Sequence, residues 1–176
     1  MIVRAAAHLV VASAALLVGL ALPTDVGVRA AAAADACSLV PGAEAEAAVG
    51  AEGGDLAGPE VVRPGTCSWH SSQSGCTLRA LSVAVSSGAA ARRFEALRAA
   101  SSVWSSAPGL GDAAFFTADE LPPGAALFIE HLHVLVGDTL AEVTMAGRIG
   151  PDASHDLLNR VGAAVAARLG QSPSSR

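Results

Sequence analysis

The chain has 176 residues, the size of one domain, and its 52% hydrophobic and 15% charged residues exclude an intrinsically disordered protein. The chain contains 11 arginines and no lysine, which excludes a P-loop lysine, a Schiff-base lysine and a Ser–Lys dyad. The formal net charge is −5, whereas proteins that bind nucleic acid typically carry a net positive charge or a basic patch.

The first 36 residues have the organisation of an export signal. Arg4 gives a short n-region its positive charge, residues 5–22 form an apolar run, and Ala34-Asp35-Ala36 fits an A-x-A cleavage site. We therefore interpret residues 1–36 as a signal peptide and expect the protein outside the cytoplasm. The apolar run is also at the edge of membrane-spanning length. Its retention as an anchor is the alternative, and membrane association is expected only in that case.

Downstream of the signal, the spacing of apolar residues alternates between helical and strand periods. Phe94 and Leu97 have helical spacing, whereas Leu81 and Val83 alternate as in a half-buried strand. The string Gly109–Asp112 precedes a strand rather than a helix, so we interpret it as a turn at the strand entry and not as a phosphate loop. The expected elements are, in order, a helix at 38–49, a loop at 50–65, strands at 67–70 and 77–86, a helix at 89–100, a strand at 113–117, a hairpin at 126–146 and a helix at 152–169.

The strongest local pattern is the hairpin, in which two apolar runs flank Gly137-Asp138. Glycine at the first central position suits a type II′ turn, and a two-residue turn fixes the pairing of the strands. Leu132 then opposes Val143 on an apolar face that is expected to meet the core. The residues on the opposite face, which we expect to be solvated, are His131, His133, Glu142 and Thr144.

Together these elements predict an α+β fold in a single domain at 37–169, with a disordered tail at 170–176. We expect an antiparallel sheet of about five strands and three helices, which are N-terminal, middle and C-terminal. About 140 residues remain after cleavage of the signal, and this length suffices for one hydrophobic core.

One group of residues in this domain has metal-ligand character. His131, His133 and Glu142 share a strand face, and two histidines with one carboxylate can form a facial metal site. The alternative is a solvated cross-strand His–Glu pair, because antiparallel sheets commonly alternate polar residues toward water. We adopt the second interpretation, so no metal site and no cofactor are predicted.

Other signs of catalysis are weak. The sequence contains no Gly-x-Ser-x-Gly string, and no catalytic residue is predicted. Trp69 and Trp104 could line a ligand pocket, but packing in the core or at its rim is the role that we expect.

Three cysteines in an exported chain suggest one disulfide and one remaining thiol. Cys67 and Cys76 are one candidate pair, because their even spacing across a short hairpin lets them face each other.

Several short strings carry a family resemblance over residues 36–169. They are, in order, Asp35-Ala36-Cys37-Ser38-Leu39-Val40, Cys67-Ser68-Trp69, Gly109-Leu110-Gly111-Asp112-Ala113-Ala114-Phe115, the Gly137-Asp138 turn and the terminal amphipathic helix. The chain resembles an actinobacterial exported lipoprotein-like family of unknown function. It is more distantly similar to the extracellular sensor domains of mycobacterial serine/threonine kinases.

This resemblance implies an α+β fold with an antiparallel sheet, and a location in the cell envelope. It also implies that Cys37 pairs with Cys67, which would leave Cys76 as a free thiol. It transfers no catalytic residue. Many family members carry a lipobox cysteine inside the signal, and this chain has none there.

The function that we expect is that of an exported, non-enzymatic domain that binds an unidentified ligand or protein partner at the cell envelope. One alternative is a small extracytoplasmic enzyme, metal-assisted through His131, His133 and Glu142. The other is a purely structural or interaction protein. A deep apolar pocket with a few converging polar groups would favour the first hypothesis over the last.

Overall fold

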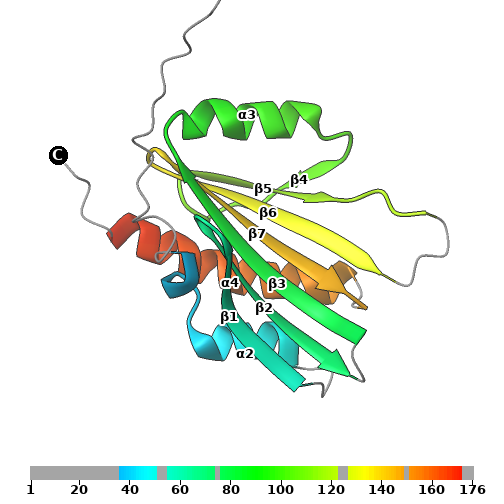
Figure 1. Cartoon of the computed structure of the whole chain (residues 1–176). Coiled ribbons are helices and arrows are strands. Elements are labelled where there is room, and N and C mark those ends of the chain that lie inside the picture. The colour runs from blue at the N-terminus through cyan, green and yellow to red at the C-terminus, as the bar shows by residue number, and fades with distance from the viewer. Residues whose placement is uncertain (1–35, 51–54, 74–75, 123–126, 149–150, 172–176) are drawn as a thin grey trace, which may run out of the picture.

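The computed structural model describes residues 36–50, 55–73, 76–122, 127–148 and 151–171 (Figure 1). A short helical segment at 36–38 opens this part of the chain. The remaining elements are α2 (Gly42–Val49), β1 (Asp55–Arg63), β2 (Thr66–Gln73), β3 (Cys76–Ser87), α3 (Ala90–Ala100), β4 (Trp104–Ser106), β5 (Ala113–Ala118), β6 (Phe128–Val136), β7 (Thr139–Gly147) and α4 (Pro151–Gln171).

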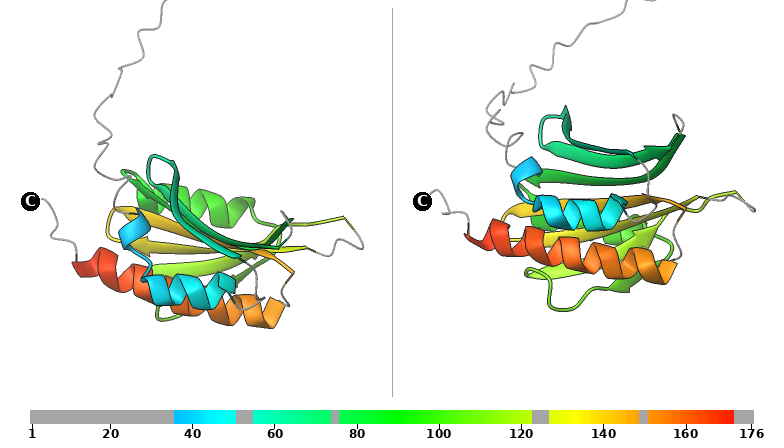
Figure 2. Two further views of the ribbon diagram at one scale, coloured as in Figure 1. Left: turned by 60° about the horizontal axis from the view of Figure 1, so that its bottom comes forward. Right: turned by 90° about the horizontal axis from the view of Figure 1, so that it is seen from below.

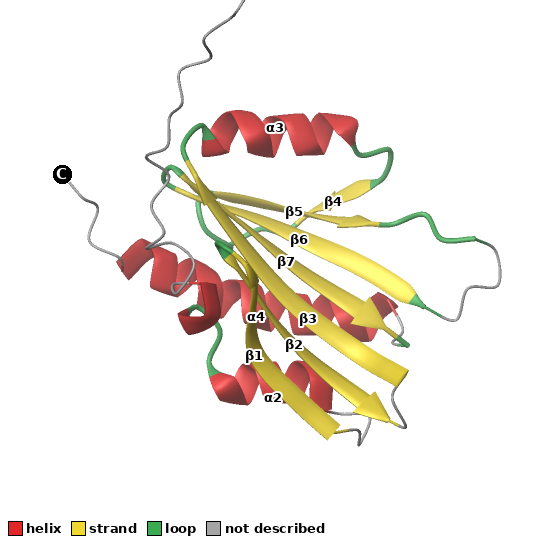
Figure 3. Cartoon of the chain, in the orientation of Figure 1, coloured by secondary structure: helices red, strands yellow, loops and turns green. Residues whose placement is uncertain are grey.

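The seven strands form one antiparallel sheet in the order β1-β2-β3-β7-β6-β5-β4. Helices α2 and α4 lie against one face of this sheet, and α3 lies against the other, as the two views of Figure 2 show. Figure 3 shows the sheet between these two helical layers. The domain is therefore a mixed α/β structure built on one antiparallel sheet, as expected from the sequence.

The sheet has seven strands where about five were expected, and both additional strands are at its edges. The expected loop at 50–65 is wrong for Asp55–Arg63, which forms β1, and Trp104–Ser106 forms β4. Strand β1 contains Gly58 and Pro59, and its pairing with β2 is irregular on either side of them. Residues of these types signal a loop in sequence, but an edge strand tolerates them because one of its sides needs no partner.

The expected helices are all present, although their ends differ. In the described residues the first begins at Gly42 rather than at 38, and the short segment at 36–38 adds a fourth helical element. The last helix continues to Gln171, two residues into the expected tail. The signal at 1–35 and the tail at 172–176 lie outside the described residues. None of the described helices is long and apolar enough to cross a membrane.

The hairpin has the register that its turn predicts. Leu132 pairs with Val143, and His133 pairs with Glu142. Gly137 has a φ of 57°, which matches the first central position of the type II′ turn. The apolar side of the hairpin faces α4, and there Gly162 allows close approach. A Cβ at Gly162 would lie 2.3 Å from Cδ2 of Leu132, so a larger residue would force the Leu132 side chain or α4 to shift.

The face covered by α2 and α4 carries the main core. Its largest fully buried side chains include Leu81, Leu132, Met145 and Leu158. The disulfide between Cys37 and Cys67 fastens the N-terminal segment to β2 beside this core, with 5.1 Å between the two Cα atoms. The expected pairing of these two cysteines is therefore confirmed. The side chain of Cys76 lies outside the described part of the structure.

The face under α3 carries a second and smaller core, formed by Ala90, Phe94, Phe115 and Leu140. The hairpin turn holds the start of α3 in place, because the backbone N–H of Ala90 donates to Oδ1 of Asp138 at 3.2 Å. A carboxylate at a helix N-terminus also interacts favourably with the helix dipole. Helix α3 is thus fixed over β5, β6 and β7, and this leaves space near its C-terminal end.

Candidate functional site

Half of the aromatic side chains of the chain gather on the α3 side of the sheet. The sequence has four Phe, two Trp and no Tyr, and Phe94, Trp104 and Phe115 meet here. The ring of Phe115 is the centre of the group, 4.9 Å from the Phe94 ring and 6.2 Å from that of Trp104. Both pairs meet edge to face, which is a favoured arrangement of aromatic rings.

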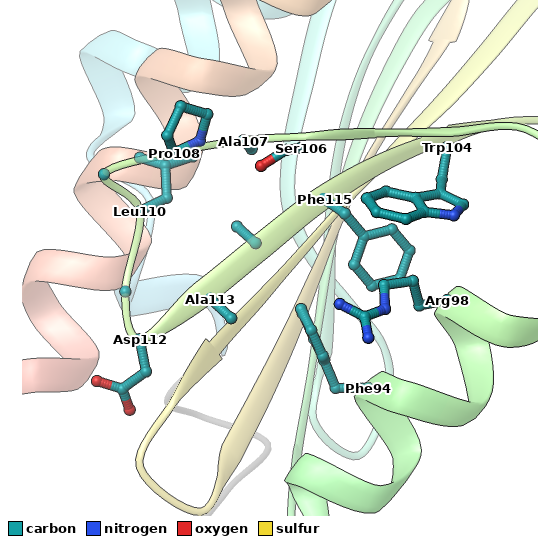
Figure 4. A pocket seen from close by; sticks show the side chains of 13 residues that line it. Phe94, Arg98, Trp104, Ser106, Ala107, Pro108, Leu110, Asp112, Ala113 and Phe115 are labelled. Carbon is teal, nitrogen blue, oxygen red and sulfur yellow. The ribbon is translucent and has the colours of Figure 1, made fainter.

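These rings line a cavity of about 320 Å³, which we call the aromatic pocket (Figure 4). The volume lies at the lower end of the range of small-molecule sites, roughly 300–1,000 Å³. Its wall comes from α3, from β4, from the connection between β4 and β5, and from β5. The lining residues are Phe94, Arg98, Trp104, Ser106, Ala107, Pro108, Gly109, Leu110, Gly111, Asp112, Ala113, Ala114 and Phe115.

The connection between β4 and β5 is held firmly at both ends. The backbone N–H of Ala107 donates to Ala114 at 3.0 Å, and that of Asp112 donates to Leu135 at 2.8 Å. The Asp112 carboxylate in turn accepts the Gly137 N–H at 2.7 Å, at the turn of the neighbouring hairpin. The expected turn at the entry of this strand is thus present. It gives the pocket a wall that is hydrogen-bonded to β5 and to the β6–β7 hairpin.

Trp104 and Arg98 stand at the mouth of the pocket. The Trp104 side chain is 46% exposed, and the Arg98 guanidinium lies 5.4 Å from the centre of its ring. This distance is within the range of a cation–π contact. Trp69 is buried in the main core, as the sequence suggested. Trp104 is not a core residue, and within the group of Phe94, Trp104 and Phe115 it is the side chain that is exposed to solvent.

A polar group continues from the floor of the pocket across the same sheet face. We call it the histidine cluster, and its members are Thr117, Asp119, His131, His133, Glu142 and Thr144. It includes the three residues that the sequence singled out, on one face as expected. The rings of His133 and Phe115 stack with centres 4.6 Å apart, so the cluster and the pocket share a wall.

The expected solvation of His133 is wrong, because this side chain is only 4% exposed. Helix α3 and Phe115 cover this end of the face, which alternation alone assigned to water. His133 Nε2 lies within hydrogen-bonding distance of Thr117 Oγ1, at 3.1 Å. Its Nδ1 lies 3.5 Å from Glu142 Oε2 and, in the described structure, makes no hydrogen bond. Burial lowers the pKa of His133, and the Glu142 carboxylate opposes this effect only in part.

His131 has the opposite electrostatic surroundings. Its Nδ1 lies 2.9 Å from Thr144 Oγ1 and 3.7 Å from Glu142 Oε1, and its Nε2 lies 3.2 Å from Asp119 Oδ1. The neighbouring Glu142 carboxylate, aided by Asp119, raises the pKa of His131, although partial burial opposes this effect. The same contact lowers the pKa of Glu142. The cluster therefore favours a charged His131–Glu142 pair beside a neutral His133.

The cluster does not have the geometry of a metal centre. Within the described residues, no three His, Cys, Asp or Glu side chains are placed to hold a metal ion together. Glu142 instead contacts the two histidines through different oxygens, Oε1 toward His131 and Oε2 toward His133. The two imidazole rings are 6.1 Å apart at their centres.

A second acid–imidazole pair, of which the carboxylate is buried, lies on the opposite face of the sheet, and the sequence did not predict it. Glu130 is 6% exposed beneath α4, and its Oε1 lies 3.0 Å from His155 Nδ1. The His155 ring packs against Phe116, with centres 3.6 Å apart. The alternation of residues in β6 could have identified Glu130 as buried, because Glu130 falls between Phe128 and Leu132 on the apolar side of the hairpin.

Comparisons with known proteins show a similarity of fold. No family model matches the chain, and no curated protein matches its sequence. One similar solved structure is the extracellular domain of PknH from Mycobacterium tuberculosis, at 8% identity over 80% of this chain and 97% of that one, with a TM-score of 0.44. Another is a mutant of the protein Mog1, at 12% identity over 62% of this chain and 76% of that one, with a TM-score of 0.30. These comparisons do not show the exported lipoprotein-like family.

Proposed function

We propose that this protein is an exported, non-enzymatic domain of the cell envelope that binds a small ligand in the aromatic pocket. The observation that carries the proposal is the gathering of Phe94, Trp104 and Phe115 around one cavity, with Trp104 open to solvent. Aromatic side chains give large contact areas, and the accessible lining of this cavity combines apolar surface with slightly more polar surface, so it can supply both ring contacts and hydrogen bonds to a ligand.

The place of action outside the cytoplasm rests on two features of the N-terminal region. Residues 1–36 have the pattern of a signal peptide, and Cys37 forms a disulfide with Cys67 directly after it. Disulfides persist in oxidising compartments and are rare in the cytosol. The ligand is accordingly a molecule of the cell envelope or its surroundings.

The chemistry of the pocket lining favours binding over catalysis. Its charged side chains are Arg98 and Asp112, and Asp112 is engaged by the N–H of Gly137. Ser106 supplies a hydroxyl, but the lining residues place no imidazole next to it. The histidine cluster lies behind Phe115, so we assign it a supporting role beneath the pocket floor rather than contact with the ligand.

An NMR screen tests the proposal. The folded ¹⁵N-labelled domain is titrated with a library of small soluble fragments, and binding should shift the backbone amides between residues 94 and 115. Trp104→Ala should abolish these shifts, whereas Val103→Ala, a neighbour that is 73% exposed and does not line the pocket, should retain them. Fragments recovered after incubation should be chemically unchanged. Shifts confined to another surface, or shifts that persist in Trp104→Ala, would contradict the proposal.

A further inference from the structure

The aromatic pocket has one cationic group, and it stands where a ligand would enter. Arg98 extends from α3 to the mouth of the cavity, and its guanidinium lies over the Trp104 ring. Its side chain is 42% exposed. The single acidic lining residue, Asp112, lies at the far end of the cavity and already accepts the N–H of Gly137. Among the residues that line the cavity, Arg98 is thus the charged group at the mouth, and Glu95 of the same helix is its partner.

Arg98 can exchange its present partner for a ligand. Its guanidinium is paired with Glu95, one turn earlier on α3, and the Glu95 side chain is 57% exposed. Ion pairs between exposed side chains contribute little to stability, so breaking or sharing this one costs little. A guanidinium has five N–H donors in a planar fork, and one contact to Glu95 leaves donors for another acid group.

The rest of the lining suits a flat apolar ring. Phe115 lies between the edges of Phe94 and Trp104, and Pro108 lies at the other end of the cavity, whereas the Leu110 side chain is buried in the main core toward α4 (Figure 4). A ligand ring that enters this space would meet the Trp104 side chain, which is exposed, whereas Phe94 and Phe115 are buried behind it. A cationic ligand would instead meet the guanidinium at the mouth as a like charge.

We propose that the aromatic pocket binds an aromatic anion, a small molecule with a planar ring system and one carboxylate, sulfonate or phosphate group. The ring lies against the exposed Trp104 side chain at the mouth, and the anionic group binds Arg98. This inference rests on the proposed function, since it names the chemistry of the ligand for the same pocket.

Two dyes with the same ring framework test the inference. 8-Anilinonaphthalene-1-sulfonate carries a sulfonate, and N-phenyl-1-naphthylamine lacks it; both fluoresce when they enter an apolar site. The folded domain should bind the sulfonate at one site and at least tenfold more tightly than the neutral dye. Arg98→Gln should weaken binding of the sulfonate at least tenfold and leave the neutral dye unaffected. Arg92→Gln, an exposed arginine of the same helix outside the pocket, should change neither affinity.

Further variants separate the outcomes. Arg98→Lys keeps the charge and should retain part of the preference for the sulfonate, and thermal melting of each variant verifies that it is folded. Equal affinity for the two dyes, both lost in Trp104→Ala, would overturn the anion preference and leave the proposed binding function standing. Sulfonate binding that survives both Arg98→Gln and Trp104→Ala would place the dye elsewhere and overturn the inference. A folded domain that binds neither dye would also overturn it, and the fragment screen then decides separately whether the pocket binds ligands at all.

Discussion

The two faces of the sheet are built for different purposes. The face under α2 and α4 is closed by a continuous apolar core, beside which the Cys37–Cys67 disulfide lies. The face under α3 is closed only in part, by four buried residues, and the remainder holds the aromatic pocket and the histidine cluster. Because one layer supplies most of the burial, the other can expose Trp104 and keep a cavity open.

Each face also contains an acid–imidazole contact with one buried partner, and the two contacts differ in their surroundings. Glu130 and His155 connect β6 to α4 across the main core. His133 and Glu142 connect two neighbouring strands beneath the pocket floor, and His131 shares the same carboxylate. The first contact fastens a helix to the sheet. The second places two histidines of opposite pKa shift directly behind the pocket.

The largest expected effect is a core truncation on the α4 face. Leu132 is fully buried beneath α4, so Leu132→Ala should lower the free energy of unfolding by about 3–5 kcal/mol. Leu140→Ala, the matched change on the α3 face, should cost about 2–3 kcal/mol, because the smaller cluster around Leu140 can collapse more readily onto the space. Urea denaturation of both variants measures the difference. Equal losses would show that the two cores contribute alike.

Removal of the disulfide should have the next largest effect. The bond joins residues separated by 30 positions, so a chain-entropy model gives a loss of about 3–4 kcal/mol for the double variant Cys37→Ser/Cys67→Ser. The control is Cys76→Ser, which should unfold at the same urea concentration as the wild type. Peptide mapping without reductant should recover Cys76 as a free thiol. A link between Cys67 and Cys76 in that map would contradict the prediction.

The sequence predicted those parts of the fold in which local and tertiary signals agree. The β6–β7 register follows from a two-residue turn and from the burial of Leu132 and Val143, so both signals point the same way. Strands β1 and β4 were missed because edge strands depend on a neighbour more than on their own composition. Neither Gly58 nor Pro59 favours a strand, and the three residues of β4 are too few to show alternation.

The candidate site was predicted only in part, for a reason that concerns the second layer. Alternation in β6 and β7 correctly placed His131, His133 and Glu142 on one face. It could not show that α3 returns to that face, so His133 was expected in water and is buried. The pocket also depends on this return, because Phe94 and Arg98 come from α3 while Trp104 comes from an edge strand. No local pattern in the sequence places these three residues together.

The contributions of His131 and His133 to folding stability should change with pH in opposite directions, although both residues lie on the α3 face of the sheet. His131 has a raised pKa in the folded state, so its stabilising contribution is complete below its unfolded pKa and is lost as the pH rises through the folded value. His133 has a lowered pKa, so folding favours its neutral form and loses stability as the pH falls below the unfolded value. His131→Gln should therefore cost more at pH 5.5 than at pH 8.5, and His133→Gln should cost less.

Urea denaturation of both variants at the two pH values measures these costs against the wild type. Ser82→Ala is the matched control, because Ser82 pairs with Thr144 on the same face and does not titrate. Its cost should be the same at both pH values. If the cost of His133→Gln rises on acidification, the burial of a neutral imidazole beneath the pocket is wrong.

The smallest effect on stability is expected at Trp104, where the effect on binding is largest. Trp104 lies on an exposed edge strand with nearly half of its surface in water, so Trp104→Phe should change the free energy of unfolding by about 1 kcal/mol or less. The variant retains only Trp69, which is 3% exposed, so its fluorescence should resist quenching by acrylamide. In the wild type, acrylamide should quench the Trp104 part of the emission, and a pocket ligand should protect it. If quenching is identical with and without a saturating ligand, Trp104 is not part of the binding site. The proposed link between its exposure and the open cavity on this face would then be wrong.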